Sequence, residues 1–253
     1  MNTVLDSPLA VFAVSLIALW TAARAGAFFR KQMRPLEEDQ RDDFAAVQAA
    51  VLTLLSLLIG FTFSMALSRY DQRKNYEEAE ANAIGTEYVR TDLLPAADAA
   101  RVRELLRSYL DQRVLFYTTG NLQQRRQIDT KTAQLQNDLW SAVQTPAVAH
   151  PTPTMALAVM GMNDVLNSQG YTQHAWWYRI PVEAWVLMAA IAISCNLMLG
   201  YGARRTSGLL LLIVPLAVSI SFFLIADIDS PLGGVIRVLP QNLLSLAQTL
   251  RAH

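Results

Sequence analysis

Long apolar runs separated by polar segments are the main pattern of this 253-residue chain. Four runs are long enough to cross a lipid bilayer, and they cover Pro8–Phe29, Phe44–Leu67, Val182–Tyr201 and Ser207–Ala226. About 20 apolar residues in a helix span a hydrocarbon core of about 30 Å, because each residue adds about 1.5 Å. The charged residues within these runs, Arg24 and Glu183, lie close enough to an end to reach the membrane surface. The pattern therefore predicts a membrane protein with four transmembrane helices.

The polar segment Ser68–Pro181, between the second and third spans, also has helical periodicity. Its apolar residues recur every three or four positions, as at Val102, Leu106 and Tyr109. Three turn signals interrupt this periodicity, at Pro95, Gly120 and Thr145–Pro153. They divide the segment into four amphipathic helices, enough for a small bundle. The predicted fold is an all-α membrane protein with a helical bundle inserted between the second and third of four transmembrane helices.

The second span is expected to continue into the bundle as one long helix. No proline or glycine interrupts residues 61–84, so this helix should reach at least Glu80. The expected organisation has four parts: a transmembrane hairpin at 1–67, the polar bundle at 68–181, a second hairpin at 182–227, and a C-terminal turn with a short amphipathic helix at 228–253.

Charged residues in the short loops predict an orientation. Arg204 and Arg205 precede the fourth span, whereas Asp227 and Asp229 follow it, and the loop at 30–43 is also rich in arginine and lysine. Basic short loops remain in the cytoplasm, so the central bundle and both termini are predicted to lie outside it, with the spans in the bacterial inner membrane. Three basic residues just after the second span lie on the predicted outer side, which the same rule does not favour: Arg69, Arg73 and Lys74.

Composition excludes several classes of function. The 21 basic and 21 acidic residues balance, which indicates no nucleic-acid partner. The single cysteine, Cys195, lies in the third span, and the three histidines are too scattered to suggest a zinc site. The chain contains no nucleophile elbow, zinc-protease motif, Walker A sequence or dinucleotide-binding glycine pattern. It is therefore predicted not to be an enzyme and to need no cofactor or metal.

Small and polar residues form a stripe along one face of the second span. The stripe consists of Ala45, Ala49, Thr53, Ser56, Gly60, Ser64 and Ser68. Small residues four apart allow helices to approach closely in lipid, which favours a packing seam. Hydroxyl groups can also line a water-filled pore, with Ile59 or Phe63 as an apolar gate. Both interpretations hold if copies of the chain pack around a common axis.

Two charged clusters lie at the ends of spans. Arg69, Arg73 and Lys74 are either an interfacial anchor or a basic collar that concentrates anions at a pore mouth. Asp227, Asp229, Ser230 and Pro231 closely follow the fourth span. Two carboxylates without a third ligand are more typical of a turn or helix cap than of a cation site.

The segment Glu80–Thr86 reads EANAIGT and is followed by Tyr88 and Arg90. Its small residues permit close helix contact, and a glycine retained in a helix indicates tight packing or a bend. The residues of this helix-contact motif are Glu80, Asn82, Ala83 and Gly85.

The EANAIGT run and the later Asp229-Ser230-Pro231 sequence resemble the bestrophin-like domain family of bacterial membrane proteins. The name of this family records a distant similarity to bestrophins, which are oligomeric anion channels. The resemblance implies a homo-oligomeric channel whose second span lines the pore. It also implies a cytosolic central region, opposite to the orientation that loop charge predicts.

Two functions are compatible with these features. The first is a homo-oligomeric ion channel for small inorganic anions, with the lipid bilayer and further copies of the chain as its partners. The alternative is a membrane-anchored sensor or scaffold whose extracytoplasmic bundle binds a ligand or a partner protein.

Overall fold

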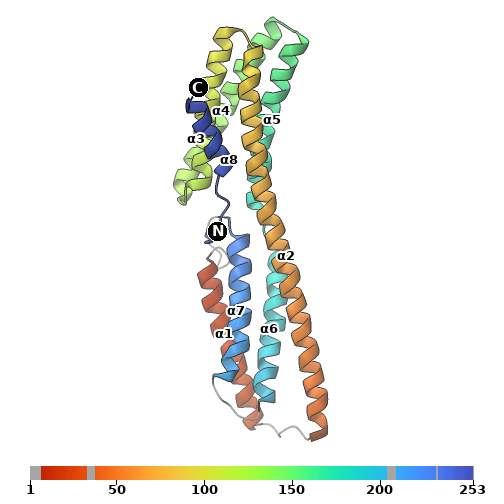
Figure 1. Ribbon diagram of the computed structural model, residues 1–253. Coiled ribbons are helices and arrows are strands. Elements are labelled where there is room, and N and C mark those ends of the chain that lie inside the picture. The colour runs from red at the N-terminus through yellow and green to blue at the C-terminus, as the bar shows by residue number, and fades with distance from the viewer. Residues whose placement is uncertain (1–6, 33–37, 204–208, 232, 253) are drawn as a thin grey trace. The chain divides into compact units, whose positions relative to one another are not determined.

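A computed structural model describes residues 7–32, 38–203, 209–231 and 233–252 of the chain (Figure 1). The described residues form helices and connecting turns, with no strand among them. The α-helices are α1 (Pro8–Gln32), α2 (Glu38–Arg90), α3 (Ala96–Thr118), α4 (Leu122–Ala149), α5 (Pro153–Trp177), α6 (Val182–Gly202), α7 (Leu210–Asp229) and α8 (Gln241–Ala252). A short 3₁₀ helix, Thr91–Leu93, follows α2. The predicted all-α fold is confirmed.

The chain divides into two compact units. The first unit comprises Met1–Tyr70 and Arg179–Arg237, and the second comprises Asp71–Tyr178 and Val238–His253. Among the described residues, four helical stretches are long and apolar enough to cross a membrane, and each overlaps one of the predicted spans. Helix α2 is continuous over 53 residues and contributes to both units, which confirms the predicted extension of the second span.

The first unit, called the membrane unit from here on because α1, α6 and α7 belong to it, is built on close contact between α1 and α6. A Cβ atom added to Gly26 would overlap the backbone carbonyl oxygen of Leu197, and one added to Gly200 would overlap that of Ala23. Small residues let helices approach in this way where lipid provides no hydrophobic driving force. Helix α7 also packs against α1, and Trp185 of α6 meets Phe222 of α7 edge to face, with ring centroids 5.9 Å apart.

The second unit is a bundle of α3, α4, α5, α8 and the C-terminal part of α2. Helix α4 begins where the Asn121 side chain accepts hydrogen bonds from the backbone N–H groups of Gln123 and Gln124. It continues through Pro146 and ends at Ala149, so the break expected at Thr145–Pro153 starts later than predicted. A proline in the last turn of a helix removes a single backbone donor, which the structure tolerates there.

Candidate functional site

The stripe of small and polar residues on α2 is exposed along its whole length. Each of the seven stripe residues, of which Ala45 is the first and Ser68 the last, is exposed. A Cβ atom added to Gly60 would meet nothing within 4 Å. In the most apolar 18-residue stretch of α2, 6% of the residues are buried, compared with 50% in the corresponding stretch of α7. The stripe is therefore not a packing seam among the described residues of one chain, whereas Gly26 and Gly200 do bring α1 and α6 into close contact.

The opposite face of α2 packs into its own unit. Leu55, Thr62 and Ala66 are buried there. Ile59 is half-buried and packs against the apolar core of the unit, whereas Phe63 is 38% exposed. Of the two gate candidates, Phe63 has the more accessible side chain.

Two of the stripe hydroxyls, those of Thr53 and Ser56, are bonded to their own helix. Thr53 Oγ1 donates to the carbonyl oxygen of Ala49 at 2.8 Å, and Ser56 Oγ donates to that of Leu52 at 2.9 Å. This back-bonding satisfies each hydroxyl proton in an apolar environment while its oxygen remains accessible. The stripe can thus face lipid, another helix or water at little electrostatic cost.

The three basic residues after the second span have different environments. Arg69 is half-buried and Lys74 is exposed. Arg73 is 2% exposed and is engaged in an interaction of its own. Arg69 and Lys74 therefore offer the more accessible charges of the predicted collar. Arg204 and Arg205, on which the predicted orientation depends, lie outside the described residues.

The acidic residues after the fourth span hold a turn together. Asp227 accepts hydrogen bonds from the backbone N–H groups of Val235 at 2.7 Å and Ile236 at 2.8 Å. Asp229 accepts one from the backbone N–H of Ile180 at 3.2 Å. A Cβ atom added to Gly234 would overlap the Asp227 carbonyl oxygen, so the turn requires glycine there. Both carboxylates serve backbone donors, as expected for a cap or turn.

The neighbouring residues of the turn are enclosed with these acids. Ser230 is 2% exposed, and its Oγ accepts a hydrogen bond from the backbone N–H of Gly233 at 3.0 Å. Pro231 is also buried. Among the described residues, no group of three or more His, Cys, Asp or Glu side chains is placed to hold a metal ion.

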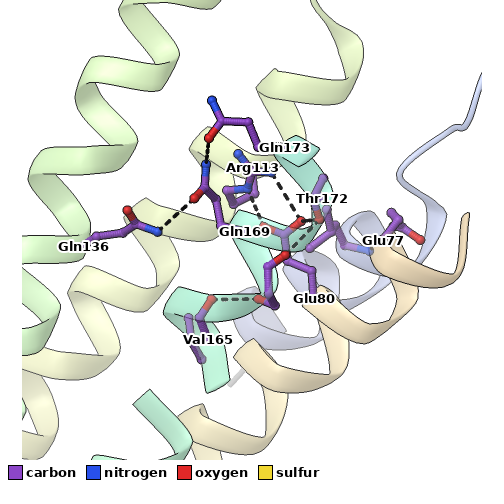
Figure 2. Close-up of polar contacts among 10 residues, drawn as sticks. Glu77, Glu80, Arg113, Gln136, Val165, Gln169, Thr172 and Gln173 are labelled. Carbon is purple, nitrogen blue, oxygen red and sulfur yellow. Dashed lines mark hydrogen bonds and ion pairs between the residues drawn. The ribbon is translucent and has the colours of Figure 1, made fainter. Parts of the chain in front are cut away.

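Glu80 is at the centre of a buried polar network in the second unit (Figure 2). Its carboxylate faces Arg113 of α3 and accepts hydrogen bonds from Nε and Nη2 of that guanidinium. Thr172 of α5 donates a third hydrogen bond, from its hydroxyl to Glu80 Oε2, at 3.1 Å. Both charged side chains are 0% exposed. The network therefore ties α2, α3 and α5 together.

Aromatic rings surround this ion pair. The Arg113 guanidinium lies over the Phe116 ring, 4.5 Å from its centroid, and Arg125 lies at the same distance from that ring. Burial tends to lower the pKa of Arg113, but the facing Glu80 carboxylate more than offsets this and raises it. Burial, together with the Glu80 charge, raises the pKa of Tyr109 and Tyr117. At neutral pH Arg113 therefore stays charged and the two tyrosines stay protonated and neutral, which suits a structural centre.

The rest of the helix-contact motif surrounds Glu80 on different faces of α2. Gly85 lies against Leu246 of α8, where an added Cβ would be 3.2 Å from Leu246 Cδ1. Ala83 is half-buried, and Asn82 is exposed. The motif thus places a charged residue in the bundle core and a glycine beneath the C-terminal helix.

Sequence reasoning missed Arg113, the partner of Glu80. Its signal was the apolar stripe of α3, which recurs with spacings of four and three at Val102, Leu106, Tyr109 and Phe116. Position 113 continues that spacing with an arginine. A charge on the buried stripe of a helix requires a buried partner.

Another buried carboxylate of α2, Glu87, is different because neither of its oxygens has a hydrogen-bond partner among the described residues. Burial raises its pKa from an ordinary value of 4.5 to about 8, with Arg90 opposing the shift and Asp164 adding to it. A Cβ atom added to Gly161 of α5 would overlap both Glu87 Oε2 and Arg90 Nη1. Glycine at 161 is therefore what admits this carboxylate.

Comparison with known proteins places this arrangement in a family. A sequence model described as Bestrophin-like domain matches residues 10–243. No curated protein matches the sequence. Solved structures of a bacterial bestrophin homologue from Klebsiella pneumoniae share the fold. One mutant form has 14% identity and a TM-score of 0.66, and the match covers 100% of this chain and 97% of the homologue.

Two further structures of the Klebsiella homologue agree with that match. One has a TM-score of 0.67 at 12% identity, covering 97% of this chain and 96% of the homologue. The other has a TM-score of 0.65 at 14% identity, covering 96% and 95%. The family match extends over most of the chain, and the shared fold extends over nearly all of it. This protein therefore belongs to the Bestrophin-like domain family of membrane proteins.

Proposed function

We propose that the protein forms a homo-oligomeric ion channel in which copies of α2 surround the pathway. The observation that carries this proposal is the exposed stripe on α2, because the opposite face of the same helix packs into its own unit. One chain has few transmembrane helices with which to enclose water. Several copies around a closed symmetry axis are the simpler construction. Membership of the Bestrophin-like family supports this function.

Small inorganic anions are the proposed permeants. The exposed Lys74 and the half-buried Arg69 follow the stripe and supply positive charge, which raises the local anion concentration. The hydroxyl groups of Thr53, Ser56 and Ser64 leave the stripe itself uncharged. The exposed Phe63 side chains of the copies are proposed to form the apolar constriction. The Ile59 side chain would reach the pathway only if α2 rotated to turn it away from the core.

The proposed orientation is the one that short-loop charge predicts, with the bundle and both termini outside the cytoplasm. Gly120→Cys and Lys31→Cys place accessible thiols at the two predicted sides, in a Cys195→Ser background. A membrane-impermeant thiol reagent added to cells with a permeabilised outer membrane should label position 120 alone. Labelling of position 31 alone would establish the inverse orientation.

Ion flux into liposomes tests the channel. Thr53→Cys and Ser56→Cys change side-chain volume little and place thiols on the stripe. Thr62→Cys is the matched control, because Thr62 lies on the packed face of the same helix and is 5% exposed. A small thiol reagent should reduce flux through the first two mutants and leave the control unchanged. Flux that no reagent affects in any of the three mutants would make the stripe a contact between subunits rather than a pore.

A sensor or scaffold remains the alternative, and one observation favours it. Apolar side chains of the second unit face solvent, among them Val89 at 66%, Met160 at 63% and Val148 at 74% exposed. These residues suit contacts with neighbouring copies or with another protein. The mass of the purified protein distinguishes the two, since a pore on a symmetry axis requires several copies. If the purified protein is a monomer and passes no ion, the scaffold function replaces the proposed channel.

A further inference from the structure

A cavity of about 270 Å³, lined by both charged and apolar residues, lies in the membrane unit where α1 ends, α2 begins and α6 ends. Its lining residues are Arg30, Arg41, Asp42, Phe44, Ala45, Gln48, Tyr201 and Gly202. The apolar runs of all three helices stop at this level. The cavity therefore lies where the phospholipid headgroups of the adjacent leaflet meet the protein.

Two guanidinium groups give the cavity its character. Arg30 and Arg41 are both half-buried, and Arg30 forms no ion pair among the described residues. Arg41 takes part in a further interaction, but a guanidinium has five N–H donors and can serve more than one acceptor. Planar guanidinium groups match the oxygens of a phosphate in a two-pronged geometry.

The other walls suit a headgroup site. Tyr201 and Phe44 lie with ring centroids 5.8 Å apart, and Gln48 adds an amide that can donate or accept hydrogen bonds. A Cβ atom on Gly202 would come within 2.9 Å of Phe44 Cε1 and 3.4 Å of Gln48 Oε1. Glycine at 202 therefore lets the ring and the amide close the cavity on that side.

We propose that this cavity binds the phosphodiester of an anionic phospholipid headgroup. Arg30, Arg41 and Asp42 are the charged residues of the lining, and their formal charges sum to one positive unit, which is opposite and equal to the single charge of a phosphodiester. A phosphate dianion would leave an uncompensated negative charge beside Asp42. Basic pockets between transmembrane helices at the membrane surface bind anionic headgroups on the same physical basis. The site does not require the protein to conduct ions.

Lipid titration of the purified, delipidated protein in a neutral detergent tests the proposal, with native mass spectrometry and the unfolding midpoint as readouts. Phosphatidylglycerol should bind in preference to phosphatidylcholine. Arg30→Gln should weaken that binding about tenfold, the loss expected for one charge-assisted hydrogen bond. Lys31→Gln is the matched control, because Lys31 is the exposed neighbour of Arg30 and does not line the cavity.

A second substitution, expected to strengthen rather than weaken lipid binding, tests the proposal if Arg30→Gln folds poorly. Asp42→Asn removes the negative charge from the lining and should strengthen phosphatidylglycerol binding. Equal affinities for the two lipids, equal losses in Arg30→Gln and Lys31→Gln, or weaker binding by Asp42→Asn would each overturn the proposal. Inorganic phosphate, titrated without lipid, identifies the source of the anion. Stabilisation by phosphate that depends on Arg30, without a lipid preference, would assign the site to a soluble phosphate compound.

Discussion

Glu80 of α2 and Arg113 of α3 form an ion pair whose two side chains are both fully buried within the helical bundle. The pair is bidentate, and Thr172 adds a hydrogen bond from α5. Hydrogen bonds from a guanidinium to a carboxylate compensate part of the cost of burying the two charges. Each charge therefore depends on the other for its stability in the core.

Removal of one partner should destabilise the second unit strongly. Glu80→Leu leaves the Arg113 charge buried without its carboxylate partner. Arg113→Met leaves the Glu80 charge buried without its guanidinium partner. Breaking a buried pair in this way costs about 3–5 kcal/mol. Chemical denaturation followed by tryptophan fluorescence should show this loss in either single mutant.

The double mutant Glu80→Leu/Arg113→Met is the control for this prediction. Apolar residues of similar volume often replace a buried ion pair at little cost, so the double mutant should be more stable than either single mutant. If the two single losses simply add in the double mutant, the residues are not coupled as the structure indicates.

Gly26 and Gly60 allow a matched test of helix packing in the membrane unit. Gly26→Ala places a Cβ atom against the backbone carbonyl of Leu197, so α1 and α6 must separate. Overpacking of this kind costs about 1–3 kcal/mol. Gly60→Ala meets open space and should preserve or slightly raise stability, because alanine favours a helix by about 1 kcal/mol. The unfolding midpoint in detergent should therefore be lower for Gly26→Ala than for Gly60→Ala. Equal midpoints would contradict the close α1–α6 contact.

The spans and the long α2 helix could be predicted because both depend on local properties of the chain. Bilayer thickness fixes the length of an apolar run, and the lack of helix-breaking residues allows a helix to continue. Helix pairing depends instead on placement in three dimensions. Ala22 and Gly26 are four residues apart, as are Ser56 and Gly60, so spacing alone cannot distinguish a contact within the chain from an exposed stripe.

The polar centre was only partly predictable for the same reason. Glu80 stood out because it belongs to a recognisable run, but its partner lies 33 residues away on another helix. Pairing of Glu80 with Arg113 rather than with Arg107 is decided by which face of α3 meets α2. The backbone N–H groups that Asp227 serves are likewise fixed by the turn that follows α7.

Glu77 should hold the C-terminal helix on the bundle. Its carboxylate accepts a hydrogen bond from the backbone N–H of Leu243 at 3.0 Å and another from the Asn242 side chain at 2.7 Å. It thus caps the N-terminus of α8 from a different helix, a contact worth about 1–2 kcal/mol. Glu77→Ala should speed amide hydrogen exchange across α8. Glu78→Ala, which alters an exposed neighbour, should leave exchange unchanged. Unchanged protection in both mutants would contradict the capping role.

Glu87 should make the stability of the second unit depend on pH. Its pKa is raised from 4.5 to about 8 chiefly by burial, with Arg90 opposing and Asp164 of α5 reinforcing the shift. Between these two values the folded protein holds a proton that the unfolded chain has released. Stability contributed by this group is therefore complete below pH 4.5 and is lost as the pH rises towards about 8.

Glu87→Gln removes the titrating proton and keeps the shape of the side chain. Unfolding midpoints measured across this range should fall with pH in the unmodified protein, and the fall should be smaller in Glu87→Gln. Glu104→Gln, on the exposed face of α3, is the control and should keep the full dependence. A wild-type slope that survives in Glu87→Gln would assign the pH dependence to another group and return Glu87 to its ordinary ionisation.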